Sequence, residues 1–330
     1  MNLTQLAEAL HAKESVDKSD FQRSARIFQS IWREEQGFSC QEDLDTKGQK
    51  YLRGSRLPIP WAEDTLSNFI TDRIQQVVRS EVSNQTASKG KLFGKPRIFN
   101  NLLSSQPLCF NLFAELKLDI PVATDLVNEL TSGRFCKVKA IEFEFSPGRR
   151  DTRYLGDRSA FDVFIECETA TGGRGFIGIE VKYHKNVIGQ AGTDGDRKKN
   201  VLYDQVADSM NCFSAGTRDE LKSSPLEQIW RDHLLAGVMQ DKDKYDDGLF
   251  VILYPRDNHH VRDAVAKYRN CLSDDSSFAE WTLEDVYSQI KKYSTAGWID
   301  LFFDRYLAFD KVTARLKHLK FTHECSGIPG

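Results

Sequence analysis

Three charged residues interrupt two adjacent segments that otherwise have the composition of buried strands. Asp162 enters the first segment, "SAFDVFIECET", while Glu180 and Lys182 break the apolar run of the second, "FIGIEVKY". Burying two carboxylates and an ammonium group is unfavourable unless the groups pair or bind a cation. Carboxylate oxygens suit Mg²⁺ or Mn²⁺, and Mg²⁺ commonly completes its coordination with water and phosphate oxygens. The three residues therefore indicate metal-assisted chemistry on a phosphate.

Strand geometry decides whether these side chains can meet. Alternation places Glu180 and Lys182 on one face of their strand, together with Gly178. If the two segments pair as an antiparallel hairpin around "TGG", Asp162 lies opposite Lys182, and Phe164 lies opposite Glu180. A turn one residue shorter would move Asp162 to the other face unless a bulge restored it. We predict that all three charged groups share one face of the sheet, although a salt-bridge cluster on a solvated face would fit the same pattern.

The hydrophobic pattern on either side predicts the elements that must position this hairpin. "FCKVKAIEFEF" alternates as a strand but changes parity, which indicates a bulge or burial on both faces, and "GLFVILYP" predicts a buried strand. The expected elements are two helices within 2–36, helices near 62–82, 100–120, 122–132, 200–213 and 225–240, strands near 135–145, 160–168, 175–184 and 248–255, and mainly helix to about 318. We expect a helical N-terminal region at 1–110 and an α/β domain with a helical C-terminal tail at 111–330.

The spacing of the charged residues resembles a known signature. "SAFD" followed by "GIEVKY" is similar to the D…ExK pattern of the PD-(D/E)xK, or restriction-endonuclease-like, nuclease superfamily, although Phe161 stands where the proline would be. Four further segments, "NLLSSQPLCFNLFAEL", "SPGRR", "QIWRDHLLAG" and "FVILYP", resemble a bacterial group of uncharacterised proteins labelled as restriction endonucleases. The likeness spans roughly residues 55–310. It implies an α/β fold with a mixed-sheet αβββαβ core and helical additions at both ends.

The resemblance also implies roles for particular residues. Asp162 and Glu180 would be metal ligands, with the backbone carbonyl of Val181 as a further ligand. Apart from the resemblance, Glu144 on the preceding strand is either an additional ligand or a surface carboxylate. Lys182 would orient or deprotonate the attacking water and offset charge in the transition state. The implied cofactor is Mg²⁺, for which Mn²⁺ could substitute.

Two other features could belong to such a site. Gln205 begins the helix after the ExK strand, where some relatives place a residue that touches the active site. The loop "PGRRDTRYLGDRS" leads into Asp162 and carries four arginines against two aspartates. It is either a solvated loop or one that grips phosphates; its arginines are Arg149, Arg150, Arg153 and Arg158.

Composition sets the broad class of protein. Lys and Arg total 45 against 48 Asp and Glu, so the net charge of −3 gives no overall sign of polyanion binding, and any such site must be local. The seven cysteines contain no CxxC pair, which favours reduced thiols in the cytoplasm. The first residues lack the pattern of a secretion signal, and no apolar stretch is long enough to suggest membrane insertion.

We therefore expect a metal-dependent endonuclease that hydrolyses nucleic-acid phosphodiester bonds, most readily those of DNA, in bacterial restriction or antiviral defence. One alternative is a catalytically inactive nuclease-like module that binds DNA or protein. Another is a nuclease of DNA repair, of mobile elements or of RNA. The expected partner is nucleic acid rather than membrane, and a homodimer or a defence-system partner protein would fit.

Overall fold

The computed structural model describes residues 2–84, 86, 90–185 and 196–325, without the side chains of 196–200 and 319–325. Its elements are α1 (Leu3–Ala9), α2 (Asp20–Glu35), β1 (Gln41–Leu44), β2 (Lys50–Arg53), α3 (Trp61–Thr65), α4 (Asp72–Val78), the π-helical turn Arg79–Ser83, α5 (Arg97–Asn100), α6 (Ser105–Leu118), α7 (Ile120–Leu130), β3 (Phe135–Phe145), β4 (Phe161–Thr169), β5 (Arg174–Val181), α8 (Asp196–Met210), α9 (Arg218–Leu221), α10 (Leu226–Lys242), β6 (Asp247–Tyr254), α11 (His259–Asn270), β7 (Phe278–Thr282), α12 (Leu283–Tyr293), α13 (Trp298–Tyr306) and α14 (Asp310–Cys325).

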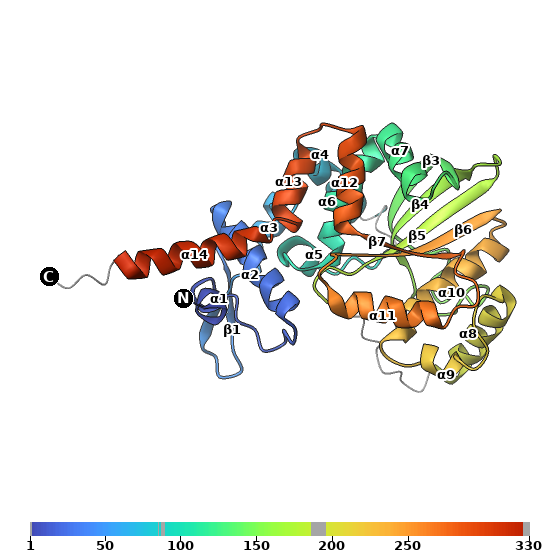
Figure 1. Cartoon of the computed structure of the whole chain (residues 1–330), viewed down its shortest axis with the longest axis horizontal. Coiled ribbons are helices and arrows are strands. Elements are labelled where there is room, and N and C mark those ends of the chain that lie inside the picture. The colour runs from blue at the N-terminus through green and yellow to red at the C-terminus, as the bar shows by residue number, and fades with distance from the viewer. Residues whose placement is uncertain (1, 85, 87–89, 186–195, 326–330) are drawn as a thin grey trace.

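A mixed sheet forms the centre of the molecule (Figure 1). Within the described residues its five strands have the order β3-β4-β5-β6-β7. The first three are antiparallel, whereas β6 runs parallel to β5 and β7 runs parallel to β6. This arrangement confirms the predicted restriction-endonuclease-like α/β core. The strand β7 and the small hairpin β1–β2 were not predicted from the sequence.

Helices cover both faces of the sheet. On one face, α4, α6, α7, α12 and α13 share a core with alternate residues of β5, among them Ile177 and Ile179. On the other face, α8, α10 and α11 pack on the aromatic residues Phe164, Phe176 and Phe250. Figure 1 shows α7 on one side of the strands and α10 with α11 on the other. The sheet is thus buried on both sides, which explains why its strands are so strongly apolar.

The hairpin β4–β5 has a register different from the one expected. Phe164 lies opposite Gly178, two residues away from the expected partner Glu180. The centre of the turn lies one residue earlier in the chain than expected, because Gly172 adopts a left-handed conformation, with φ of 83°. The shift of two residues preserves parity. Beyond Val163 the alternation of β4 breaks, because Phe161 packs against Gly178 and Phe164 on the face covered by α10, whereas Val163 belongs to the core under α6. Asp162 lies at this irregularity and lines a pocket with Cys109 and Phe110 of α6, so the prediction that it shares a sheet face with Glu180 and Lys182 is not confirmed.

Gly178 has a packing role beside the charged residues. A Cβ atom built on this glycine would lie 2.6 Å from the ring of Phe161, so any other residue would displace that ring. Phe161, which replaces the proline of the superfamily name, is itself completely buried. The large ring of Phe161 therefore fills the space in which Gly178 has no side chain.

Two other sequence predictions concern local geometry. The bulge expected in β3 is confirmed, because its register with β4 shifts between Val138 and Ala140. The single helix expected at 62–82 is wrong, because α3 ends where Leu66 turns left-handed, with φ of 54°. A new helix, α4, then begins under the cap of Thr71, whose hydroxyl accepts a hydrogen bond from Ile74 N–H at 3.1 Å.

The N-terminal and C-terminal regions meet around one buried cation. Arg305 of α13 is completely buried, donates to Gln29 Oε1 at 2.8 Å and to Asn68 Oδ1 at 2.6 Å, and stacks 3.6 Å from the ring centroid of Trp32. Its partners come from α2 and from the segment between α3 and α4. Residues far apart in sequence thus close this part of the core. The predicted domain boundary near residue 110 stays a prediction.

Candidate active site

Asp162 lies where β4 and β5 separate. Regular pairing runs as far as Val163 and Ile179, and beyond it Asp162 Oδ2 accepts a hydrogen bond from Val181 N–H at 2.9 Å. The carboxylate therefore sits against the peptide group that joins Glu180 to Val181. Lys182 N–H bonds to Leu253 on the other side of the strand, at 2.8 Å. By alternation, the carbonyl of Val181 faces the same side as Asp162.

Glu180 and Lys182 form a direct ion pair. Lys182 Nζ lies 2.6 Å from Glu180 Oε1, and the two side chains are only 12% and 10% exposed. Gln228 of α10 donates to the same oxygen at 2.8 Å. Among the described residues, Glu180 Oε2 accepts no hydrogen bond, so it remains open to a further ligand.

Electrostatics connect the two carboxylates. The pKa of Asp162 is raised well above its ordinary value, first by burial and next by the negative charge of Glu180. Burial alone would lower the pKa of Lys182, but its pairing with Glu180 outweighs burial and raises it. The ammonium group thus stays charged, while the carboxylates still repel each other.

This donor set fits a divalent cation. Two mutually repelling carboxylates, an open Oε2 and a carbonyl on the same side provide hard oxygen ligands, which Mg²⁺ and Mn²⁺ prefer. The set is small, however. Within the described residues, no group of three or more His, Cys, Asp or Glu side chains is arranged to hold a metal ion.

Glu144, the candidate additional ligand, lines a small pocket together with Asp162, Gln106 and Phe143. Its backbone is left-handed, with φ of 50°, an unusual conformation for a glutamate that marks a break in the strand. Arg149 Nη2 donates to its Oε1 at 2.7 Å, and Gln106 Nε2 donates to its Oε2 at 3.2 Å. Burial raises the pKa of Glu144. To bind a metal, this carboxylate would have to exchange one of its present partners.

The arginines of the loop 149–158 differ in availability. Arg149 is turned inward, because besides Glu144 it bonds to the carbonyl of Arg158 at 2.6 Å. Arg153 is 77% exposed but is paired with Asp151 at 2.7 Å. The side chains of Arg150 and Arg158 are exposed and form no hydrogen bond or ion pair within the described residues. If this loop contacts phosphates, these two are the free cations.

A polar stripe on α10 completes the site, and its residues were not among those predicted from the sequence. Gln228, Arg231 and Asp232 are three and four residues apart, so they lie on one face of a helix whose other residues are largely buried. The pKa of Asp232 is raised to about 7, chiefly by burial, and the charge of Glu180 adds to this rise. Such a stripe in an otherwise apolar helix is the signal that could have identified these residues. Gln205, by contrast, is exposed on α8, and its role stays a prediction.

A comparison with protein families agrees with this geometry. A model of the PD-(D/E)XK nuclease superfamily matches residues 15–308. The chain belongs to that superfamily. Asp162, Glu180 and Lys182 follow one another in the order of the PD-(D/E)XK signature, and their assignment as its residues stays a prediction.

Other comparisons add no closer relative. No curated protein and no solved structure matches the chain significantly. None of the helices within the described residues is sufficiently long and apolar to span a bilayer. Membership of the PD-(D/E)XK superfamily points to nuclease activity on a nucleic-acid substrate.

Proposed function

We propose that this protein is a divalent-metal-dependent endonuclease that cleaves DNA in the bacterial cytoplasm, as part of restriction or antiviral defence. The observation that carries the proposal is the contact of Asp162 with the Glu180–Val181 peptide, next to the ion pair of Glu180 with Lys182. The defence role rests on the resemblance to restriction endonucleases. A homodimer would supply the two active sites that a double-strand cut requires. The proposal is also compatible with a partner protein from a defence system.

Each side chain has a role that follows from its position. Asp162, Glu180 Oε2 and the Val181 carbonyl would hold the metal, which supplies Lewis-acid activation of water and stabilises charge on the phosphate. Lys182 is held at the edge of this set by Glu180, so its ammonium group can orient the attacking water. Gln228 fixes the orientation of Glu180. Glu144 and Arg149 form a neutral pair beside Asp162.

The proposal predicts a defined pattern of cleavage. Purified protein should nick or linearise plasmid DNA in Mg²⁺ or Mn²⁺ and be inactive in EDTA, because the carboxylates alone cannot activate water. The assay should include supercoiled plasmid, linear DNA and RNA. If RNA alone is cleaved, then RNA rather than DNA is the substrate. The absence of metal-dependent cleavage of any of them would favour an inactive binding module.

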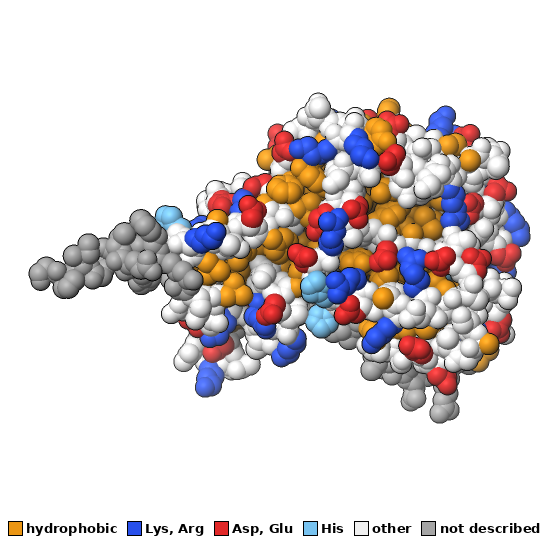
Figure 2. All heavy atoms as spheres, viewed as in Figure 1, with side chains coloured by type: hydrophobic (Ala, Val, Ile, Leu, Met, Phe, Trp, Pro, Cys, Tyr) orange, Lys and Arg blue, Asp and Glu red, His pale blue; other side chains and the backbone are white. Residues whose placement is uncertain are grey.

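Substrate binding can be tested separately through salt dependence. Lys and Arg lie interspersed with Asp and Glu over the face drawn in Figure 2, so a few free cations should carry the interaction with phosphates. Replacing Arg150 and Arg158 should reduce the slope of log K against log salt by up to about 1.8, or about 0.9 for each phosphate that is no longer neutralised. Glycine is the suitable replacement at Arg150, where φ is 60°; alanine serves at Arg158.

Arg153→Ala is the matched control for this measurement. Its charge is already neutralised by Asp151, so its removal should change the slope less. Binding would be followed by fluorescence anisotropy of labelled DNA in EDTA, where no cleavage occurs. A slope equal to that of the wild type in the Arg150 and Arg158 double variant would show that the loop does not contact phosphates.

A further inference from the structure

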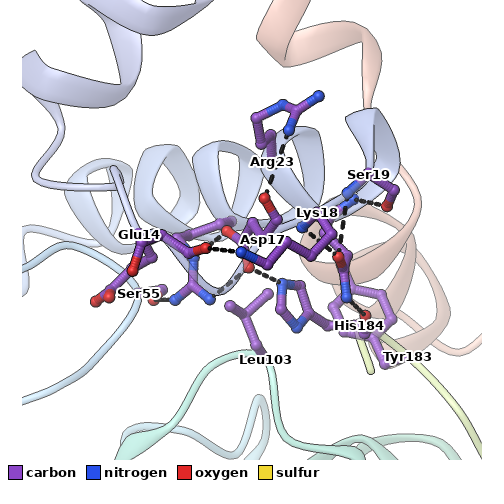
Figure 3. A network of polar contacts seen from close by, with 12 residues as sticks. Glu14, Asp17, Lys18, Ser19, Arg23, Ser55, Leu103, Tyr183 and His184 are labelled. Carbon is purple, nitrogen blue, oxygen red and sulfur yellow. Dashed lines mark hydrogen bonds and ion pairs between the residues drawn. The ribbon is translucent and has the colours of Figure 1, made fainter. Parts of the chain in front are cut away.

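The chain directly after Lys182 is held by the N-terminal part of the protein. Figure 3 shows the imidazole of His184 directed at Asp17, which precedes α2. His184 Nε2 lies 2.9 Å from Asp17 Oδ1. Regular strand β5 ends at Val181, so this contact lies just beyond the last paired residue of the strand.

Asp17 is a rigid attachment point. Its side chain is only 1% exposed, and Arg26 of α2 contacts both of its oxygens, at 2.5 and 2.8 Å. Arg26 in turn donates to Ser55 at 2.9 Å. Burial would raise the pKa of Asp17, but the contacts with Arg26 and His184 lower it to about 2. The carboxylate is thus charged and fixed between the guanidinium of Arg26 and the imidazole of His184.

The backbone after Lys182 is held as well as the side chains. Asn258, the cap of α11, donates to the Tyr183 carbonyl at 3.0 Å, and Gln22 donates to the His184 carbonyl at 3.3 Å. Gln29 donates to the Tyr183 hydroxyl at 2.9 Å. Together with the contact between Asp17 and His184, these are four polar contacts to Tyr183 and His184. Three of the four are made by residues of the segment 17–29. We call these contacts with Tyr183 and His184 the N-terminal clamp.

We propose that Asp17 and His184 are positioning residues, which fix the segment after β5 so that Lys182 remains seated on Glu180 in the geometry needed for cleavage. The inference rests on the proposed function. Glu180 Oε1 holds the ammonium group of Lys182. The position of the Lys182 backbone therefore determines which other atoms of the site this group can contact. A displacement of about 1 Å at a catalytic group is enough to reduce rate strongly.

The test uses full-length variants that leave Asp17 and Arg26 paired. His184→Ala should lower kcat about 10-fold with little change in KM, because the clamp residues are buried and are not available to contact substrate. His184→Gln should restore most of the rate, since its amide can donate to Asp17 from a similar position. Asp20→Asn is the matched surface control: Asp20 is 92% exposed, lies three residues from Asp17, and should behave as wild type.

A second readout does not depend on activity. In His184→Ala, amide hydrogen exchange of a peptide covering residues 180–185 should accelerate, while peptides from β6 and α10 should exchange as in the wild type. Unchanged exchange in this peptide would overturn the clamp, whether or not the protein cleaves nucleic acid. Accelerated exchange with an unchanged kcat would overturn the positioning role. Inactivity of the wild type refutes the proposed function instead, and exchange alone then decides whether the clamp exists.

Discussion

Lys182→Ala should lower the cleavage rate by at least about 100-fold, the usual effect of removing one group that stabilises a transition state. In the structure this ammonium group is almost buried, and it contacts one of the two carboxylates expected to bind metal. Its loss leaves Asp162 and Glu180 in place. Metal binding should therefore survive, and removing the cation paired with Glu180 should even strengthen it.

Two measurements separate this effect from damage to the fold. Plasmid nicking gives the rate, and the rise in Tm on adding Mn²⁺ reports metal binding without requiring activity. Lys185→Ala is the matched control, because Lys185 is exposed three residues further along the chain. A Lys182→Ala protein that cleaves as rapidly as the wild type would contradict the catalytic assignment.

Asp162→Asn should abolish cleavage and yet stabilise the metal-free protein. The asparagine can still accept the hydrogen bond from Val181 N–H, but it no longer repels Glu180. Each kcal/mol of repulsion removed should raise Tm by about 1–2 °C in a chain of 330 residues. Sites that sacrifice stability for function commonly behave in this way.

The pH dependence of that gain has a definite sign. Because the pKa of Asp162 is higher in the folded protein than its ordinary value of 3.8, the folded state binds this proton more tightly than the unfolded state. Below the ordinary value the group is neutral in both states, and the two proteins should have equal Tm. As pH rises through the folded-state value, the wild type should lose stability relative to Asp162→Asn.

Thermal unfolding of both proteins in EDTA across the acid-to-neutral range would measure this difference. Added Mn²⁺ should reverse the order, because only the wild type keeps both carboxylates for the metal. A Tm difference that does not vary with pH would mean that Asp162 and Glu180 do not repel each other in solution.

Local patterns were sufficient to predict the central part of the fold. The alternation in β4 and β5 and the apolar run of β6 follow from burial on both faces of the sheet, and the D…ExK residues lie at the strand ends as expected. The hairpin register was wrong by two residues because Gly172 and Gly173 can both adopt turn conformations. Only the three-dimensional turn shows that Gly172 has the positive φ.

The rest of the site depends on contacts that no local pattern specifies. Gln228 reaches Glu180 across 48 residues, and Gln22 reaches the His184 carbonyl across 162. Helical periodicity shows that α10 has a polar stripe, but it does not show which strand the stripe will face. The same holds for α2, because its periodicity predicts a helix without showing that its N-terminal end will contact the segment after β5.

The burial of Arg305 affects the order in which parts of the protein can fold during synthesis. Its contact with Gln29 joins residues 276 positions apart, so α2 lacks this partner until residue 305 has left the ribosome. The β4–β5 hairpin is local and can form much earlier. We therefore expect nascent chains, or chains terminated before residue 305, to contain the D…ExK hairpin without a secured N-terminal segment, so that nuclease activity appears only after α13 has been synthesised.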